Sequence, residues 1–169
     1  SGLPSTKSDI GPWLEDKVNQ SLRRLGKKKL YALLAHDPLE IRRFASKEGV
    51  RAIRVLKEKG MIENFGVSIY SPEELTSELM HQELNIVQAP LNVLDNRIID
   101  SGLAQRLFDI GVQLHARSIF LQGLLLIERC EVKPFFDRWS EVIEKWHDFL
   151  LRDNLSPIDA CTTFVVRNP

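Results

Sequence analysis

The sequence has few of the features that mark several large protein classes. It has only two cysteines, Cys130 and Cys161, neither in a C-x-x-C pair nor near a histidine at metal-ligand spacing. They indicate neither a disulfide framework nor a metal site, and we expect reduced thiols in the cytoplasm. No apolar run approaches the roughly 18 residues of a membrane helix. We also expect no signal peptide, because no apolar segment follows the first residues.

The sequence also has no excess of charge of either sign. The 23 Lys and Arg residues are balanced by 23 Asp and Glu residues, so no basic excess suggests nucleic acid binding. The short basic run at residues 27–29 is interpreted as a solvated turn. With 169 residues, 43% of them hydrophobic, the chain is long enough for one domain with a core. We therefore predict a single domain over residues 1–169.

Short apolar runs alternate with amphipathic segments along the chain. One predicted helix starts after Ser71, its N-cap, and Glu74 completes a capping box there. We expect the predicted strand at residues 30–35 to be buried on both faces. The predicted strands are residues 30–35, 65–68, 86–90 and 112–116, and the predicted helices are residues 12–25, 48–59, 97–110, 134–152 and 156–166.

This alternation predicts a parallel sheet covered by helices, either a barrel or a doubly wound sheet. Periodicity alone does not choose between them, although no strand is followed by the G-x-G-x-x-G fingerprint of dinucleotide-binding doubly wound folds. The segment 134–152 is predicted to be the longest helix. Its aromatic face is interpreted as core rather than as a stacking platform; the face consists of Phe135, Trp139, Val142, Trp146 and Phe149.

Five stretches carry a family resemblance through their order and spacing. They are SLRRLG at residues 21–26, LLAHDP at 33–38, LKEKGMIENFGVS at 56–68, VQAPLNVLD at 87–95 and ARSIFLQGLL at 116–125. Together they resemble the patterns SL-x-RLG, LLH-x-P, LKEEGKIR-x-IGVS, VQ-x-x-YNLLD and ARSPL-x-QGLL of aldo/keto reductases. Each is weak alone, but the resemblance runs from near the first residue to the last.

The resemblance implies an α/β fold, an incomplete TIM (β/α)8 barrel whose chemistry lies at the carboxyl ends of the strands. His36, Ser68, Gln88 and Arg117 all stand at or just past a predicted strand end. A whole barrel needs about 250 residues. We expect N-terminal strands and the last strand to lie outside this chain, with a remnant of one more strand at Leu3-Pro4 left open.

The family reduces carbonyl groups with NADPH through a tetrad of Tyr, Lys, His and Asp. By resemblance, His36 is the catalytic histidine. Gly2 stands where the lysine is expected, with Lys7 as the alternative. No segment matches the tetrad Tyr and Asp, so we expect the chain alone to be inactive. His81, His115 and His147 match no family position and are interpreted as structural or surface residues.

The resemblance also implies an NADP site. Ser68 and Gln88 match positions that bind the nicotinamide carboxamide, and Arg117 matches a position flanking the nicotinamide. Ser118 and Gln122 match the loop beside the pyrophosphate. Ile69 replaces the family's asparagine, and the segment expected to hold the adenosine 2′-phosphate would follow Pro169. We therefore expect weak NADP binding or none in this chain.

Two functions remain open at this stage. One is an NADPH-dependent reductase acting on a small-molecule carbonyl substrate, and the other is a non-catalytic barrel that serves as a binding or scaffold module. A barrel lacking strands has open sheet edges, so self-association is expected. The alternative is that helix 134–152 folds over the gap. The side chains predicted to face the barrel interior are Leu33, Val67, Val87 and Leu114.

Overall fold

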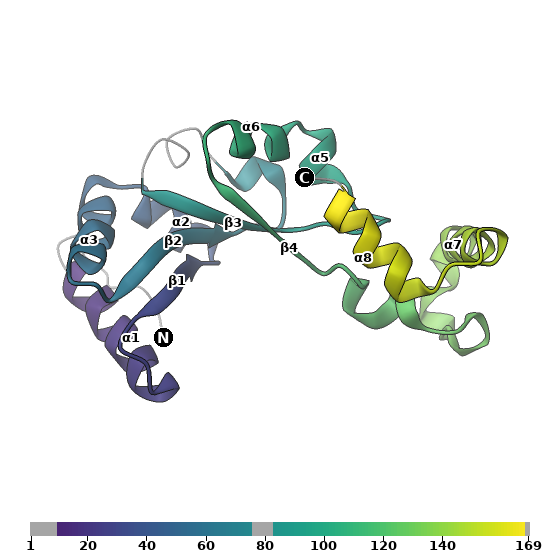
Figure 1. Ribbon diagram of the computed structural model, residues 1–169, viewed down its shortest axis with the longest axis horizontal. Helices are drawn as coiled ribbons and strands as arrows, with labels where there is room; N and C mark the ends of the chain where they lie inside the picture. Colours follow the sequence, from purple (N-terminus) through teal and green to yellow (C-terminus); the bar gives the residue numbers. More distant parts are fainter. Residues whose placement is uncertain (1–9, 76–82, 168–169) are drawn as a thin grey trace.

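A computed structural model describes residues 10–75 and 83–167 of the chain. The described residues contain one four-stranded sheet in the order β1-β2-β3-β4, with every neighbouring pair parallel. Helices flank this sheet, and a further group of helices extends beyond the end of β4 (Figure 1). The strands are β1 (Leu30–Ala35), β2 (Ile62–Ser68), β3 (Leu84–Pro90) and β4 (Gln113–Arg117).

The helices alternate with the strands as the sequence predicts. The α-helices are α1 (Ile10–Leu25), α2 (Pro38–Phe44), α3 (Lys47–Glu58), α5 (Arg97–Asp100), α6 (Leu103–Asp109), α7 (Ser140–Arg152) and α8 (Pro157–Arg167). The 3-10 helices are η2 (Pro72–Glu74), η3 (Leu121–Leu126), η4 (Arg129–Glu131) and η5 (Pro134–Trp139).

Local sequence explains where the N-terminal helices begin and end. After α1, Gly26 takes a left-handed φ of 61°, and the N–H of Lys27 donates to the carbonyl of Leu22 at 3.0 Å. This is the Schellman arrangement, which satisfies carbonyls at the helix end. Before α3, the Ser46 hydroxyl accepts a hydrogen bond from the Gly49 N–H at 3.2 Å, as an N-cap residue should.

One large cluster of buried apolar residues fills the space between the sheet and its helices, and we call it the helix-side core. From α1 it takes Leu14 and Val18, and from α3 it takes Ile53 and Leu56. These spacings of three and four residues put each pair on one helical face. The strands contribute fully buried Val67 and Val87 to the same cluster.

The prediction that Val67 and Val87 face the barrel interior is wrong. Both belong to the helix-side core, and Leu33 and Leu114 pack against it from the same side of the sheet. The opposite, interior face carries Leu34, Gly66 and Ile86, which follow one another across the sheet in register. The two faces are exchanged because a shift of one residue moves every side chain to the other face.

Gly66 is required where three strands meet on this interior face. A Cβ added there would lie 2.5 Å from the carbonyl oxygen of Ile86 and 2.5 Å from a methyl group of Leu34. Because the carbonyl oxygen belongs to the sheet backbone, it cannot move aside. The close packing of β1, β2 and β3 at this level therefore depends on the absence of a side chain.

Strand β1 differs from its prediction in burial. It spans residues 30–35 as expected, but most of its residues are only half-buried and Tyr31 is 55% exposed. The reason is its position, because β1 is an edge strand of the described sheet. Within the described residues β1 pairs with β2 on one side only, so its side chains have packing partners from only one neighbouring strand.

Three helix predictions need correction. The segment 97–110 forms two short helices, α5 and α6, separated at Gly102, whose φ is 71°. The segment 134–152 is 3-10 helix η5 followed by α7, so α1, with 16 residues, is longer. After Ser71 the 3-10 helix η2 begins, and residues 76–82 lie outside the described part of the chain; the Glu74 carboxylate accepts from the Tyr70 N–H rather than from Ser71.

Two further predictions differ in detail. Helix α2 is not among the predicted helices; it begins at Pro38, and proline is favoured at the first position of a helix. The aromatic face of segment 134–152 is only partly core. Trp146 is buried, but Phe135 is 76% exposed, and Trp139 and Val142 are also exposed.

Candidate active site at the carboxyl ends of the strands

Four polar side chains form a row across the interior face of the sheet. Ser68 ends β2 and is paired in register with Gln88 of β3, which is paired with His115 of β4. Strand β1 ends at Ala35, opposite Val67, so the next residue, His36, follows at the level of Ser68. We call His36, Ser68, Gln88 and His115 the polar row.

The polar row contains a hydrogen-bonded pair with unused capacity. The hydroxyl of Ser68 donates to Oε1 of Gln88 at 3.1 Å. This leaves the Nε2 amide group of Gln88 as a donor and the Ser68 oxygen as an acceptor. An amide ligand needs one acceptor for its NH₂ group and one donor for its carbonyl. The pair therefore matches a carboxamide in its hydrogen-bonding pattern.

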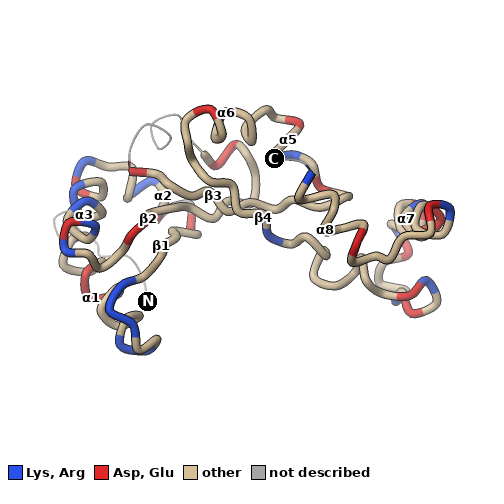
Figure 2. Tube along the Cα trace, viewed as in Figure 1, with Lys and Arg blue, Asp and Glu red and all other residues tan. Residues whose placement is uncertain are grey.

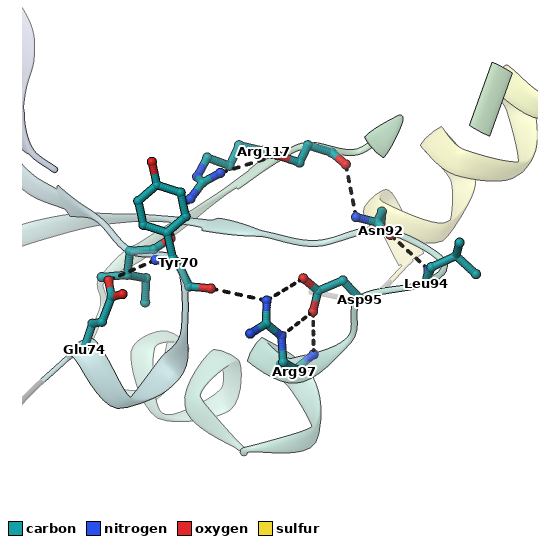
Figure 3. A network of polar contacts seen from close by, with 9 residues as sticks. Tyr70, Glu74, Asn92, Leu94, Asp95, Arg97 and Arg117 are labelled. Carbon is teal, nitrogen blue, oxygen red and sulfur yellow. Dashed lines mark hydrogen bonds and ion pairs between the residues drawn. The ribbon is translucent and has the colours of Figure 1, made fainter. Parts of the chain in front are cut away.

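Arg117 lies two residues beyond His115, at the end of β4, and is in register with Pro90. Its Nη2 donates to the carbonyl of Ile69 at 3.0 Å, and its guanidinium carbon lies 4.5 Å from the centre of the Tyr70 ring (Figure 3). Its Nε is buried and, among the described residues, has no hydrogen-bond partner. Arg117 thus keeps donor capacity at the mouth of the site.

Ile69 explains how the loop after β2 differs from the family pattern. Its side chain is fully buried and belongs to the helix-side core, so it does not face the polar row. Its backbone remains in use, because the N–H donates to the Gln88 carbonyl at 2.9 Å and the carbonyl accepts from Arg117. The position supports the site through its main chain alone.

A network of polar contacts ties together the loops after β2, β3 and β4 (Figure 3). Asn92 is buried, and its Nδ2 donates to the Ser118 carbonyl at 3.1 Å. The guanidinium of Arg97 pairs with Asp95 at 2.8 Å and donates to the Tyr70 carbonyl at 3.3 Å. Hydrogen bonds from Arg97, with its positive charge, hold the pKa of Asp95 below its usual value. The network fixes the backbone around Arg117.

Asn92 and Asp95 are not among the predicted site residues. The signal was present in the VQAPLNVLD stretch, where an amide and a carboxylate directly follow a buried strand. Loop residues at that end of a parallel sheet surround the site in barrel proteins. Their role here is to position neighbouring loops, which only the three-dimensional contacts reveal.

Ser118 and Gln122 lie outside the polar row. Both have left-handed backbone angles, with φ of 57° and 54°, in the loop that follows β4. They line a pocket of about 660 Å³ whose other walls are apolar. The apolar lining comes from Leu94, Leu121, Leu124, Ile127, Phe136, Trp139, Val142 and Ile143.

The histidines that match no family position separate into different environments. His115 belongs to the polar row, and its Nε2 lies 3.3 Å from Oε1 of Gln113. The same oxygen accepts from the Tyr31 hydroxyl at 3.1 Å. His147 on α7 is buried, and its Nε2 has no partner among the described residues. Gly2, Lys7 and His81 lie outside the described residues.

No helix in residues 10–75 or 83–167 is both long and apolar enough to span a membrane. Within the same ranges, no group of three or more His, Cys, Asp or Glu side chains could hold a metal ion.

The curved parallel sheet, its helical cover and the polar side chains at its carboxyl ends define part of a (β/α)8 barrel. The family model described as "Aldo/keto reductase family" matches residues 5–169. The chain therefore belongs to the aldo/keto reductase family, and the predicted incomplete barrel is confirmed. No curated protein matches the sequence significantly.

Solved structures support the same fold. A glycerol dehydrogenase from Gluconobacter oxydans is 20% identical, with a TM-score of 0.68 over 92% of this chain and 51% of that one. An aldo-keto reductase from Bacillus halodurans is 22% identical, with a TM-score of 0.59 over 76% of this chain and 42% of that one. An aldo/keto reductase from Klebsiella pneumoniae, solved with NADP and acetate, is 19% identical, with a TM-score of 0.54 over 85% and 47%. This chain spans about half the length of these structures.

Proposed function

We propose that the intact protein is an NADPH-dependent reductase of a small carbonyl substrate and that this chain supplies the nicotinamide-facing part of its site. The observation that carries the proposal is the Ser68–Gln88 pair, whose free donor and acceptor match a carboxamide. Membership of the aldo/keto reductase family supports the same chemistry. We place this activity in the cytoplasm, in keeping with two free cysteines.

Each residue of the chain has a distinct role in this proposal. His36 orients the substrate carbonyl and assists proton transfer. Ser68 and Gln88 hold the carboxamide, and Arg117 flanks the nicotinamide with its guanidinium fixed by Ile69 and Tyr70. Ser118 and Gln122, which line the pocket beyond β4, lie beside the cofactor pyrophosphate. NADPH, when bound, supplies the hydride.

The chain by itself lacks the proton donor. Neither of its tyrosines stands at the family's catalytic position, and Tyr70 is engaged with Arg117 instead. We therefore expect no turnover of simple aldehydes by the isolated chain, followed through the loss of NADPH absorbance. Turnover that disappears in Tyr31→Phe or Tyr70→Phe would show that the family positions are wrongly assigned.

A second candidate is a non-catalytic barrel that serves as a binding or scaffold module. The specific observation in its favour is Ile69, whose apolar side chain lies in the helix-side core and offers no polar contact to a cofactor. Cofactor binding distinguishes the two candidates, because a scaffold has no need to keep a carboxamide site.

The test is a titration of the chain with nicotinamide mononucleotide and with NADPH, followed by protein NMR. The reductase proposal predicts weak, saturable binding that Gln88→Leu abolishes. Gln105→Leu is the matched control, because Gln105 is exposed on α6 and bonds to Asp109 far from the polar row. Saturable binding that Gln88→Leu leaves unchanged would contradict the carboxamide site, because the nicotinamide would then bind elsewhere. A sub-micromolar dissociation constant for NADPH would contradict the expectation of weak binding.

A further inference from the structure

The side chain of Arg117 crosses the interior face of the sheet. Its backbone belongs to the end of β4, in register with Pro90 of β3. Its guanidinium nevertheless reaches the loop after β2, where Nη2 donates to the Ile69 carbonyl at 3.0 Å. Because β3 lies between β2 and β4, the side chain must pass over the carboxyl end of β3 to make this contact. The charge of Arg117 therefore lies on the interior face, between the ends of β2 and β4.

This charge lies beside the Ser68–Gln88 pair. The N–H of Ile69, whose carbonyl accepts from Arg117, donates to the Gln88 carbonyl at 2.9 Å, and Ser68 is the residue before Ile69. Arg117 and His115 are two residues apart on β4, so their side chains project from the same face of the sheet, and His115 is in register with Gln88. A group bound to the free donor and acceptor of the pair is thus next to the guanidinium.

Several contacts hold Arg117 in this position. Its guanidinium carbon lies 4.5 Å from the centre of the Tyr70 ring, and its Nη1 donates to the Ser118 hydroxyl at 3.4 Å (Figure 3). The backbone of Tyr70 is fixed in turn, because its N–H donates to Glu74 and its carbonyl accepts from Arg97. A long side chain that is already held in place loses little further freedom when a ligand binds beside it.

The groups that Arg117 contacts do not cancel its positive charge. The carbonyl, the hydroxyl and the aromatic ring against its guanidinium are all uncharged. The Asp95 carboxylate pairs instead with Arg97, at 2.8 Å. Hydrogen bonds from Arg97 chiefly lower the pKa of Asp95, and the charge of Arg117 lowers it further. The charge of Arg117 therefore acts on groups around the site that it does not touch.

A nicotinamide ring changes its charge when it is oxidised, since the oxidised ring is a cation and the reduced ring is neutral. We propose that Arg117 makes this site selective for the reduced form, because its guanidinium repels the oxidised ring and leaves the reduced ring unaffected. Two unit charges about 10 Å apart near a protein surface repel each other enough to change a dissociation constant by roughly tenfold. The inference rests on the proposed function and adds to it a preference for binding the reduced cofactor and releasing the oxidised one.

The test titrates the chain with nicotinamide mononucleotide and with its reduced form, followed by protein NMR. Both ligands carry the same phosphate, so they differ in the charge of the ring. We expect the reduced form to bind about tenfold more tightly. Arg117→Met should remove this preference, and Arg117→Lys, which keeps the charge, should retain it. Arg106→Met is the matched control, because Arg106 is exposed on α6, which covers the opposite face of the sheet. It should leave the ratio of the two dissociation constants unchanged.

Failure of this inference is distinguishable from failure of the proposed function. If neither form binds to the unchanged chain, the carboxamide site itself is wrong, and the preference falls with it. If the oxidised form binds as tightly as the reduced form, or if the preference survives Arg117→Met, the site stands and the role of Arg117 alone is overturned. Equal loss of the preference in Arg117→Met and Arg117→Lys would assign it to shape rather than charge, which also overturns the inference. Circular dichroism establishes that each variant is folded.

Discussion

The sheet region and the C-terminal helical region of this chain differ in the size of their hydrophobic cores. The buried members of the helix-side core come from strands β1, β2 and β3 and from five helices, and partly buried residues of β4 and of α8 pack against the same cluster. The C-terminal region, residues 118–167, has a separate small cluster whose buried members are Leu125, Trp146, Leu150 and Cys161, which we call the C-terminal core. Around it, Phe135, Leu151 and Val166 are each about three-quarters exposed.

This difference shows what a strand ladder adds to packing. In the sheet region each apolar residue is held between a backbone ladder and a helix, so burial at one position supports burial at the next. The C-terminal region has no strand, and its anchors are few; one is the hydrogen bond from the Trp146 indole to the Leu125 carbonyl at 3.2 Å. Charged residues of both signs occur along both regions (Figure 2), so charge does not explain the contrast.

The largest expected effect is on the two cores. Leu56→Ala should lower the free energy of unfolding by about 4 kcal/mol, because it opens a cavity in a rigid core, whereas Leu150→Ala should cost about 2 kcal/mol, because exposed neighbours can collapse around it. Urea unfolding followed by circular dichroism measures both. Equal losses would show that the two regions form one cooperative unit and that the contrast is only one of size.

Helix caps provide a second comparison at smaller scale. Ser46 caps α3, accepting from Gly49 and donating to the Arg43 carbonyl at 2.7 Å. Ser156 caps α8, accepting from the Asp159 N–H at 3.1 Å. Ser46→Ala should cost about 1 kcal/mol and Ser156→Ala about 0.5 kcal/mol, since the second cap is exposed to water that can replace the hydroxyl. Thermal unfolding compares them, with Ser→Thr at each site as the variant that keeps the hydroxyl, which both donates and accepts at these caps.

The smallest expected effect concerns ion pairs and acid pH. The pKa of Glu83 is lowered from 4.5, chiefly by the hydrogen bond from Lys57 and further by Arg54. Because the folded state holds the ionised form, this contribution is present above about pH 4.5 and is lost as the pH falls below it. Glu83→Gln should therefore destabilise the chain by less than about 1 kcal/mol at neutral pH and by nothing in acid.

Asp153 in the C-terminal region is the control for this ion pair. Its pKa is also lowered, by the Arg152 guanidinium, but both side chains of the pair are exposed to solvent. Asp153→Asn should leave the unfolding midpoint unchanged at every pH. Acid titrations of both variants by circular dichroism decide the point, and a pH-dependent loss in Asp153→Asn would contradict this account of screening.

Much of the fold could be predicted from the sequence because local patterns carry it. Apolar runs fix all four strands to within a few residues, and Gly26 and Ser156 mark helix boundaries through backbone preference and capping. Helix α2 and the break at Gly102 were missed because Pro38 and Gly102 each allow two local structures. Tertiary packing, which a single sequence does not display, chose between them.

The candidate site was likewise predictable only in part. Its residue types follow from motif order in the sequence alone, which placed His36, Ser68, Gln88 and Arg117 at strand ends and identified the family. The tertiary structure decided which side chains meet: it put His115 into the polar row, joined Arg117 to Tyr70 and turned Ile69 into the helix-side core. The reason is that side-chain facing and pairing depend on strand register and sheet curvature, and both are set by contacts between residues distant in the chain.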